Sequence, residues 1–312
     1  MRLRRLGGLA AGGRTLDDPR GETGHSLIRD WRDVSVFSLA NASFIRPIRP
    51  IRPIPPEPAP AYMTGSTLVI QSHRMPLPYP WLEDCLASVQ RWAAGLEYDY
   101  RFLDDALFDS LPEDLVNRTA RQPVIAADLA RLRALKQGLD EGFATVIWCD
   151  ADLLVFDPVR LKLSDERYAL GREVWVQQDA NQLRAYVKVH NAFMSFRRGN
   201  PFLDFYQHAA DRLVRAHAGS GKMAPQFVGP KLLTALHNIV GCPVTETAAM
   251  LSPLVARNLL AGGGEALALF RKRSTEPPAA FNLCASLVAI EELSSVQVDE
   301  LIELLLKDFA WS

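Results

Sequence analysis

The chain has 312 residues, enough for one large domain or two small ones. It carries 35 lysines and arginines against 36 aspartates and glutamates, and this near neutrality argues against a dedicated nucleic-acid-binding protein. No apolar run approaches the roughly 20 residues that span a bilayer, and four widely spaced cysteines without a Cys-x-x-Cys pair favour reduced thiols in a cytoplasm over a zinc site or a disulfide framework.

Residues 1–62 differ in composition from the rest of the chain. They begin with arginines but lack the apolar segment of a signal peptide, and they contain three Ile-Arg-Pro units followed by further prolines. Because proline fixes φ and removes a backbone donor, this stretch cannot join a helix or a central strand. We interpret it as a disordered leader or as residues translated upstream of a true start at Met63. A proline-rich ligand for an aromatic groove is the alternative, and a single folded domain is expected at 63–312.

From residue 66 onward, strand-like and helix-like patterns alternate. The expected strands cover residues 66–72, 98–105, 144–149, 173–178 and 187–196, and the expected helices cover 81–93, 124–139, 201–218, 229–238 and 298–310. The regular alternation up to about residue 160 predicts a parallel sheet with helices on both faces. The later strands are less evenly spaced, which predicts a mixed sheet.

The stretch TVIWCDADLLVFDP, residues 145–158, places two carboxylates directly after an apolar strand. In an open α/β sheet, ligands bind beyond the carboxyl ends of the strands, and Asp150 and Asp152 stand at such an end. Two residues apart on an extended segment, their side chains should point the same way and repel each other. A divalent cation, Mn²⁺ or Mg²⁺, would relieve that repulsion and hold the diphosphate of a substrate. The alternative is a polar turn at a strand end.

The helix expected at 124–139 contains charged residues at unusual positions. With a rotation of about 100° per residue, Asp128 falls inside the apolar arc of this helix and Arg131 falls at its edge. A carboxylate on a buried face, three residues before an arginine, can form an internal ion pair or cap the start of the helix. Because the pair shortly precedes the Asp-x-Asp strand, we favour a pair at the rim of a pocket that hydrogen-bonds a sugar.

The block AADLARLRALKQGLDEGFATVIWCDADLLVFDP resembles a group of GT-A-fold glycosyltransferases with a DxD motif. This group includes capsular-polysaccharide and yeast α-1,6-mannosyl transferases. Its pattern is a Ser/Ala-Asp-x-x-Arg helix, an apolar strand and then Asp-x-Asp. The segments STLVIQSHR, HNAFMSFRRGNPFLDFY and FVGPKLLTALH are similar to other parts of the group, in the same order. The resemblance implies a Rossmann-like GT-A fold, with a mostly parallel mixed central sheet flanked by helices.

The resemblance also implies roles for individual residues. Asp128 and Arg131 would contact the donor sugar, Asp150 would face the sugar or ribose and the metal, and Asp152 would bind the metal beside the diphosphate. The other implied donor-side residues are Gln71, in the strand that lines the nucleotide pocket, and Asn191, Gly229 and Pro230 on the sugar and acceptor side.

The C-terminal part of the chain departs from the group. Many members have a histidine there, in a His-x-Trp-like stretch that reaches the metal or the diphosphate. The comparable stretch in this chain is AAFNLCASL, with Asn282 in that place. An amide oxygen can ligate a hard cation, so Asn282 is a candidate third metal ligand, and a loop cap is the alternative.

These features predict a metal-dependent, cytoplasmic glycosyltransferase. It would move a sugar from a nucleotide-sugar donor to a glycan or lipid-linked acceptor, in polysaccharide biosynthesis and with retention of configuration, as most of the group does. It would have no nucleic-acid partner, and peripheral membrane association would suit a lipid-linked acceptor. One alternative is a haloacid-dehalogenase-type phosphatase, although Leu154 stands where that family has Thr or Val. The other is a non-catalytic nucleotide-sugar- or carbohydrate-binding protein. The sequence identifies no nucleophile.

Overall fold

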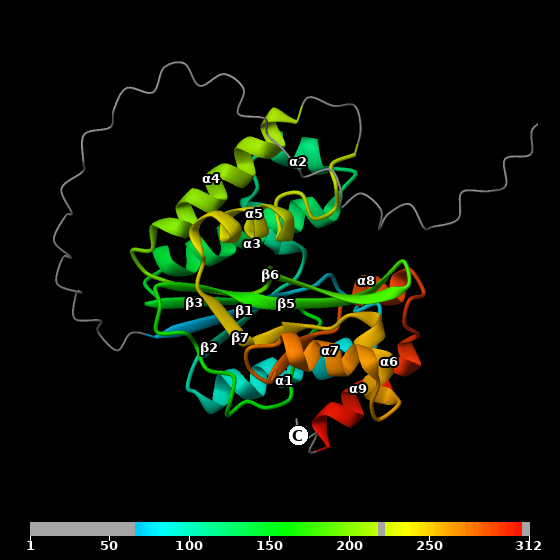
Figure 1. Cartoon of the computed structure of the whole chain (residues 1–312). Coiled ribbons are helices and arrows are strands. Elements are labelled where there is room, and N and C mark those ends of the chain that lie inside the picture. Colours follow the sequence, from blue (N-terminus) through cyan, green and yellow to red (C-terminus); the bar gives the residue numbers. More distant parts are fainter. Residues whose placement is uncertain (1–65, 218–221, 308–312) are drawn as a thin grey trace, which may run out of the picture. The chain divides into compact units, whose positions relative to one another are not determined.

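The computed structural model describes residues 66–217 and 222–307, which form an eight-stranded sheet between two layers of helices (Figure 1). The leader predicted at 1–62 lies outside the described residues. The strands are β1 (Thr67–Ser72), β2 (Asp99–Leu103), β3 (Thr145–Cys149), β4 (Leu153–Val155), β5 (Tyr168–Asp179), β6 (Gln182–Arg197), β7 (Val244–Met250) and β8 (Ala280–Asn282). The helices are α1 (Leu82–Gly95), the 3₁₀ helix η1 (Asp105–Ser110), α2 (Glu113–Thr119), α3 (Pro123–Asp140), α4 (Pro201–Ala216), α5 (Pro230–Val240), α6 (Pro253–Leu260), α7 (Glu265–Arg273), α8 (Ala285–Ala289) and α9 (Ser295–Leu306).

The strand order of the sheet is β2-β1-β3-β6-β5-β7-β8-β4. Strands β2, β1 and β3 are parallel, as are β5, β7 and β8. Strand β6 runs antiparallel between β3 and β5, and the short β4 runs antiparallel to β8 at the edge. The expected α/β class, with a mixed sheet that is parallel in most of its pairings, is therefore confirmed.

Helices α3, α4 and α5 cover one face of the sheet, and α1, α6, α7 and α9 cover the other (Figure 1). Apolar clusters fill both interfaces, with Trp148 and Tyr206 buried on the α3 side and Trp81, Trp92 and Phe270 buried on the α1 side. Helix α3 begins with a proline, whose φ is already set for a helix. It is buried around most of its circumference because it contacts α2, α4, β1 and β3.

The predicted strands at 173–178 and 187–196 are parts of a longer hairpin. Strands β5 and β6 pair from Tyr168 and Phe196 to Asp179 and Gln182 around a tight turn, and the outer end of the hairpin extends beyond α3, α4 and α5 (Figure 1). The prediction missed the buried base of β5, residues 168–172, and the more exposed outer end of β6, residues 182–186. A bulge between Leu170 and Gly171 shifts the register near the base.

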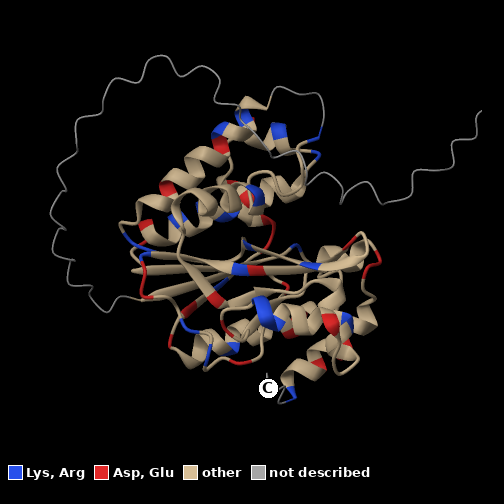
Figure 2. Ribbon diagram, in the orientation of Figure 1, with Lys and Arg blue, Asp and Glu red and all other residues tan. Residues whose placement is uncertain are grey.

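Basic and acidic positions are intermixed along the described helices and loops, in keeping with the nearly neutral composition (Figure 2). Among the described residues, no helix has both the length and the apolar character needed to cross a membrane. The four cysteines are free thiols, three of them buried.

Candidate functional site

The Asp-x-Asp segment follows β3 at the carboxyl end of the parallel strands. The favoured interpretation placed it on an extended segment and the alternative was a polar turn. The chain turns here, and the Leu153 N–H donates to the Asp150 carbonyl at 3.0 Å. The turn is held from both sides, because the Asp150 N–H donates to the Ala192 carbonyl at 2.8 Å and Gln71 Nε2 donates to the Asp150 carbonyl at 3.1 Å. Strands β1 and β6 therefore fix where the carboxylates emerge.

Gln71 is placed beneath this turn. It is fully buried. Its Oε1 accepts a hydrogen bond from the Tyr100 hydroxyl at 3.0 Å, and its Nε2 donates to the Asp150 carbonyl. The predicted donor-pocket residue is thus bonded at both ends of its amide, and it supports the turn directly.

The carboxylate of Asp150 has one oxygen occupied by donors and one available. Its Oδ1 accepts from Arg131 Nη1 at 2.8 Å and from Trp148 Nε1 at 2.6 Å, and the Arg131 guanidinium lies 5.1 Å from the centre of the Trp148 ring. Within the described part of the chain, Oδ2 takes no hydrogen bond, and the side chain is 26% exposed. The sequence interpretation did not identify Trp148, although its spacing of two residues from Asp150 along the strand was a usable signal.

Asp128, Arg131 and Asn191, all predicted to lie on the donor side, contact one another. Arg131 Nη2 lies 3.4 Å from Asp128 Oδ1, the Asn191 side-chain amide donates to the same oxygen at 2.8 Å, and Arg131 Nη1 donates to the Asn191 carbonyl at 3.1 Å. Asp128 lies inside α3 and does not cap it. All three residues are buried. The Arg131 guanidinium links the carboxylate of Asp128, on α3, to the carboxylate of Asp150, after β3.

Asp128 is electrostatically strained. Burial raises its pKa from the ordinary value to about 6, against the opposing effect of Arg131. Its Oδ2 is buried without a hydrogen-bond partner and faces Gly229, which precedes Pro230 at the start of α5. A Cβ on Gly229 would lie 2.7 Å from Asp128 Oδ2 and 2.8 Å from Asn191 Nδ2. A side chain at residue 229 would therefore meet the buried Asp128 carboxylate and the Asn191 amide.

Gly229→Ala is expected to lower the free energy of unfolding by about 1–3 kcal/mol, because the added methyl group displaces the buried Asp128–Asn191 pair. The matched control is Gly95→Ala at the end of α1, where a Cβ would meet nothing within 4 Å and where we expect no loss of stability. Urea unfolding of both variants measures the difference. Equal stabilities would show that the Asp128 pocket can accommodate a side chain at residue 229.

Within the described residues, both carboxylate oxygens of Asp152 accept a hydrogen bond, whereas the two bonds to Asp150 reach the same oxygen. Asn282 Nδ2 donates to Asp152 Oδ1 at 2.6 Å, and the Ala285 N–H donates to its Oδ2 at 2.7 Å. Burial, and then the nearby Asp150 charge, raise its pKa to about 6. The three predicted metal-site residues are therefore neighbours, and Asn282 directs its amide nitrogen at the aspartate.

The donor set is suited to a hard divalent cation with few protein ligands. In the described residues, no group of three or more His, Cys, Asp and Glu side chains could hold a metal. The two carboxylates of the turn nevertheless offer anionic oxygens, and Asp150 Oδ2 has no competing donor. Mg²⁺ commonly binds one or two carboxylates and takes its other ligands from water and substrate phosphates. The residues fit that kind of site.

No protein-family model matches the chain, and no curated protein matches it. The solved structures that align with it include a glycosyltransferase involved in the glycosylation of the major capsid of PBCV-1, at 13% identity and a TM-score of 0.43 over 76% of this chain and 99% of that one. The galactosyltransferase LgtC, in complex with donor and acceptor sugar analogues, aligns at 12% identity and a TM-score of 0.38 over 76% of this chain and 95% of that one. Mouse xyloside xylosyltransferase 1 aligns at 10% identity and a TM-score of 0.37 over 71% of this chain and 98% of that one. Likeness at this level does not assign an activity, which depends on the site itself.

Proposed function

We propose that this chain is a GT-A-fold glycosyltransferase that moves a sugar from a nucleotide-diphosphate donor to a hydroxyl acceptor. The observation that carries the proposal is the contact between the two segments that resemble the family. Arg131 on α3 bonds Asp128 on the same helix and Asp150 after β3, beside Asp152 and Asn191. All of these groups lie at the carboxyl end of the parallel strands, where α/β sheets bind nucleotides.

In this proposal, Asp150 and Asp152 hold Mn²⁺ or Mg²⁺ beside the donor diphosphate. The bound cation would neutralise the charge that develops on the leaving diphosphate. Arg131 is already bonded to Asp150, Asp128 and the Asn191 carbonyl, so its role is to orient Asp150 with Oδ2 outward. A preoriented carboxylate loses less entropy when it binds, which favours correct positioning of the donor.

The donor sugar would lie on the side of the site formed by Asp128, Asn191 and Gly229. These residues come from α3, β6 and the start of α5, so three separate elements form this wall. A glycan or lipid-linked acceptor, retention of configuration, a place in polysaccharide biosynthesis and a cytoplasmic location with peripheral membrane contact complete the proposal. They follow from the sequence resemblance alone.

A panel of nucleotide sugars incubated with the protein and Mn²⁺ tests this function. We expect release of a nucleoside diphosphate from one donor, suppressed by EDTA and accelerated by the correct acceptor. Release of inorganic phosphate from sugar phosphates would instead identify a phosphatase. Saturable binding of a nucleotide sugar without turnover would identify a binding protein. In an active sample, the anomeric proton signal of the product distinguishes retention from inversion.

A further inference from the structure

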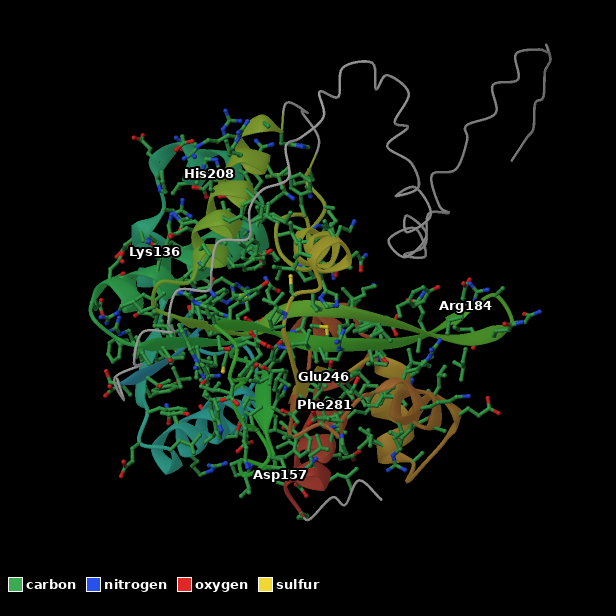
Figure 3. The ribbon with its side chains drawn as sticks, turned by 60° about the vertical axis from the view of Figure 1, so that its left-hand side comes forward. Lys136, Asp157, Arg184, His208, Glu246 and Phe281 are labelled. Atoms are coloured by element: carbon green, nitrogen blue, oxygen red, sulfur yellow. The ribbon has the colours of Figure 1, made fainter. Side chains whose placement is uncertain are left out.

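The position of the Asn282 backbone is set by strand pairing, independently of its side-chain contacts. It ends β8, where it pairs with Leu153 of β4 on one side and Met250 of β7 on the other. Its neighbour Phe281, labelled in Figure 3, is buried among the rings of Phe156 and Phe270. Successive side chains of a strand point to opposite faces, so the anchored Phe281 determines the direction of Asn282.

The contacts of the Asn282 amide distinguish its oxygen from its nitrogen. The Cys284 N–H donates to Oδ1 at 3.1 Å, and the Cys284 thiol lies 3.1 Å from the same atom. On the other side, Nδ2 donates to Asp152 Oδ1 at 2.6 Å. A flipped amide would put oxygen against carboxylate and NH₂ against N–H. Both contacts therefore favour the same orientation, which directs the amide oxygen away from Asp152.

The backbone after Asn282 completes a clamp on Asp152. Cys284 adopts a left-handed conformation with φ of 54°, which turns the chain so that the Ala285 N–H reaches Asp152 Oδ2 at 2.7 Å. The Leu283 N–H also donates to the Asp152 carbonyl at 2.9 Å. Each carboxylate oxygen thus receives one donor from the 282–285 segment and keeps further lone pairs for a ligand.

We propose that Asn282 is a positioning residue for Asp152 and is not itself a cation ligand. This inference rests on the proposed function, because it gives Asp152 the cation. Donors bonded to a ligating carboxylate fix its rotamer and favour its charged form, and loss of such a partner typically weakens metal binding about 10- to 100-fold. The protein would then supply only two carboxylates, and the donor diphosphate would complete the coordination.

The first test measures the contact in metal-free protein. At pH 8 in EDTA, Asn282→Asp sets two carboxylates against each other and should lower the melting temperature by roughly 5–10 °C. The exchanged pair Asp152→Asn with Asn282→Asp restores every hydrogen bond. The new amide at position 152 would donate to the new carboxylate at position 282, and the N–H groups of Ala285 and Cys284 would each keep an oxygen acceptor.

We therefore expect the double variant to recover most of the loss. A double variant no more stable than Asp152→Asn alone overturns the proposal, and this comparison can be made even if Asn282→Asp alone fails to fold.

Asn258→Asp is the matched control for this test. Asn258 Oδ1 accepts the N–H groups of Ala266 and Leu267, and an aspartate there keeps the acceptor at the start of α7. Its melting temperature should change little, which separates the loss of a donor from the general effect of an added charge.

The second test measures the metal itself. Titration of the protein with Mn²⁺ alone, followed by electron paramagnetic resonance, should show binding that is about 10- to 100-fold weaker in Asn282→Ala. The protein is then labelled with ¹³C at its asparagine side-chain carbonyls. The ¹³C hyperfine couplings of bound Mn²⁺ should be the same in the wild-type protein and in Asn282→Ala. A coupling that is present in the wild-type protein and lost in Asn282→Ala would come from Asn282. Such a coupling would make Asn282 a ligand and overturn this inference alone. Failure of the wild-type protein to bind Mn²⁺ would overturn both this inference and the cation site of the proposed function.

Discussion

Asp150→Asn is expected to lower turnover by about 10²- to 10³-fold while leaving the fold intact, a loss typical of removing one electrostatic element from an active site. The asparagine keeps an oxygen for Arg131 and Trp148, and its new NH₂ group takes the place of Oδ2, which has no donor against it. The anionic oxygen offered to the cation disappears, and Arg131 keeps its hydrogen bond here while Asp128 remains its charged partner. Nucleoside diphosphate release measures the activity, and a melting curve measures the fold.

Asp152→Asn should be equally inactive but less stable. In this variant the asparagine oxygen can accept from Ala285, but its NH₂ group then faces the NH₂ group of Asn282. An unsatisfied buried donor costs about 1–3 kcal/mol of folding free energy. The two aspartates are therefore distinguished by their melting temperatures, although their activities fall together.

Asp157→Asn is the control for both variants. Asp157 belongs to the same stretch of sequence, but it pairs with Arg160 at 2.6 Å and lies at the lower margin of the molecule in Figure 3. Its activity should match that of the wild-type protein. Full turnover in Asp150→Asn or Asp152→Asn would remove that aspartate from the reaction, and loss in all three variants would point to damage of the loop.

The part of the fold that sequence predicts is the part where local pattern and burial agree. Strands β1 and β3 are short apolar runs buried on both faces, and α3 carries an apolar arc, so their positions follow from composition and periodicity. Strands β4 and β8 have three residues each and exist because they pair with each other across 125 residues or more of chain. No local window contains that information.

In the candidate site, too, the sequence predicts what depends on local pattern and misses what depends on contacts between distant segments. A charge on an apolar arc predicted that Asp128 is buried, and its partner Arg131 lies within reach on the same helix. The sequence left the turn of the Asp-x-Asp segment as the less favoured alternative, because the turn is held by Gln71 and the Ala192 carbonyl from other strands. The orientation of the Asn282 amide depends on hydrogen bonds at both of its ends, which residue spacing does not specify.

Arg131→Met is expected to be the most destabilising single change in the site. Arg131 is 8% exposed and compensates Asp128 and Asp150 together, so its loss leaves two carboxylates without their cation. Removing one partner of a buried ion pair costs about 3–5 kcal/mol. Arg101→Met is the control, because its bond to Glu141 at 2.7 Å is at the surface and is worth about 1 kcal/mol or less. Urea unfolding measures both.

The loss of folding stability in Arg131→Met should also depend on pH. Asp128 determines whether that loss grows or shrinks as the pH rises. Its folded pKa of about 6 is already above the unfolded value of about 3.9, and removing Arg131, the largest lowering influence, raises it further. A carboxyl with a raised folded pKa binds more protons in the folded state, so stability falls as pH rises between the two pKa values. The difference in free energy of unfolding between the wild-type protein and the variant should therefore be smallest near pH 5 and largest near pH 8. A deficit of equal size at both pH values would show that Asp128 does not depend on Arg131 for its charge, and that the guanidinium is held there by packing against Trp148.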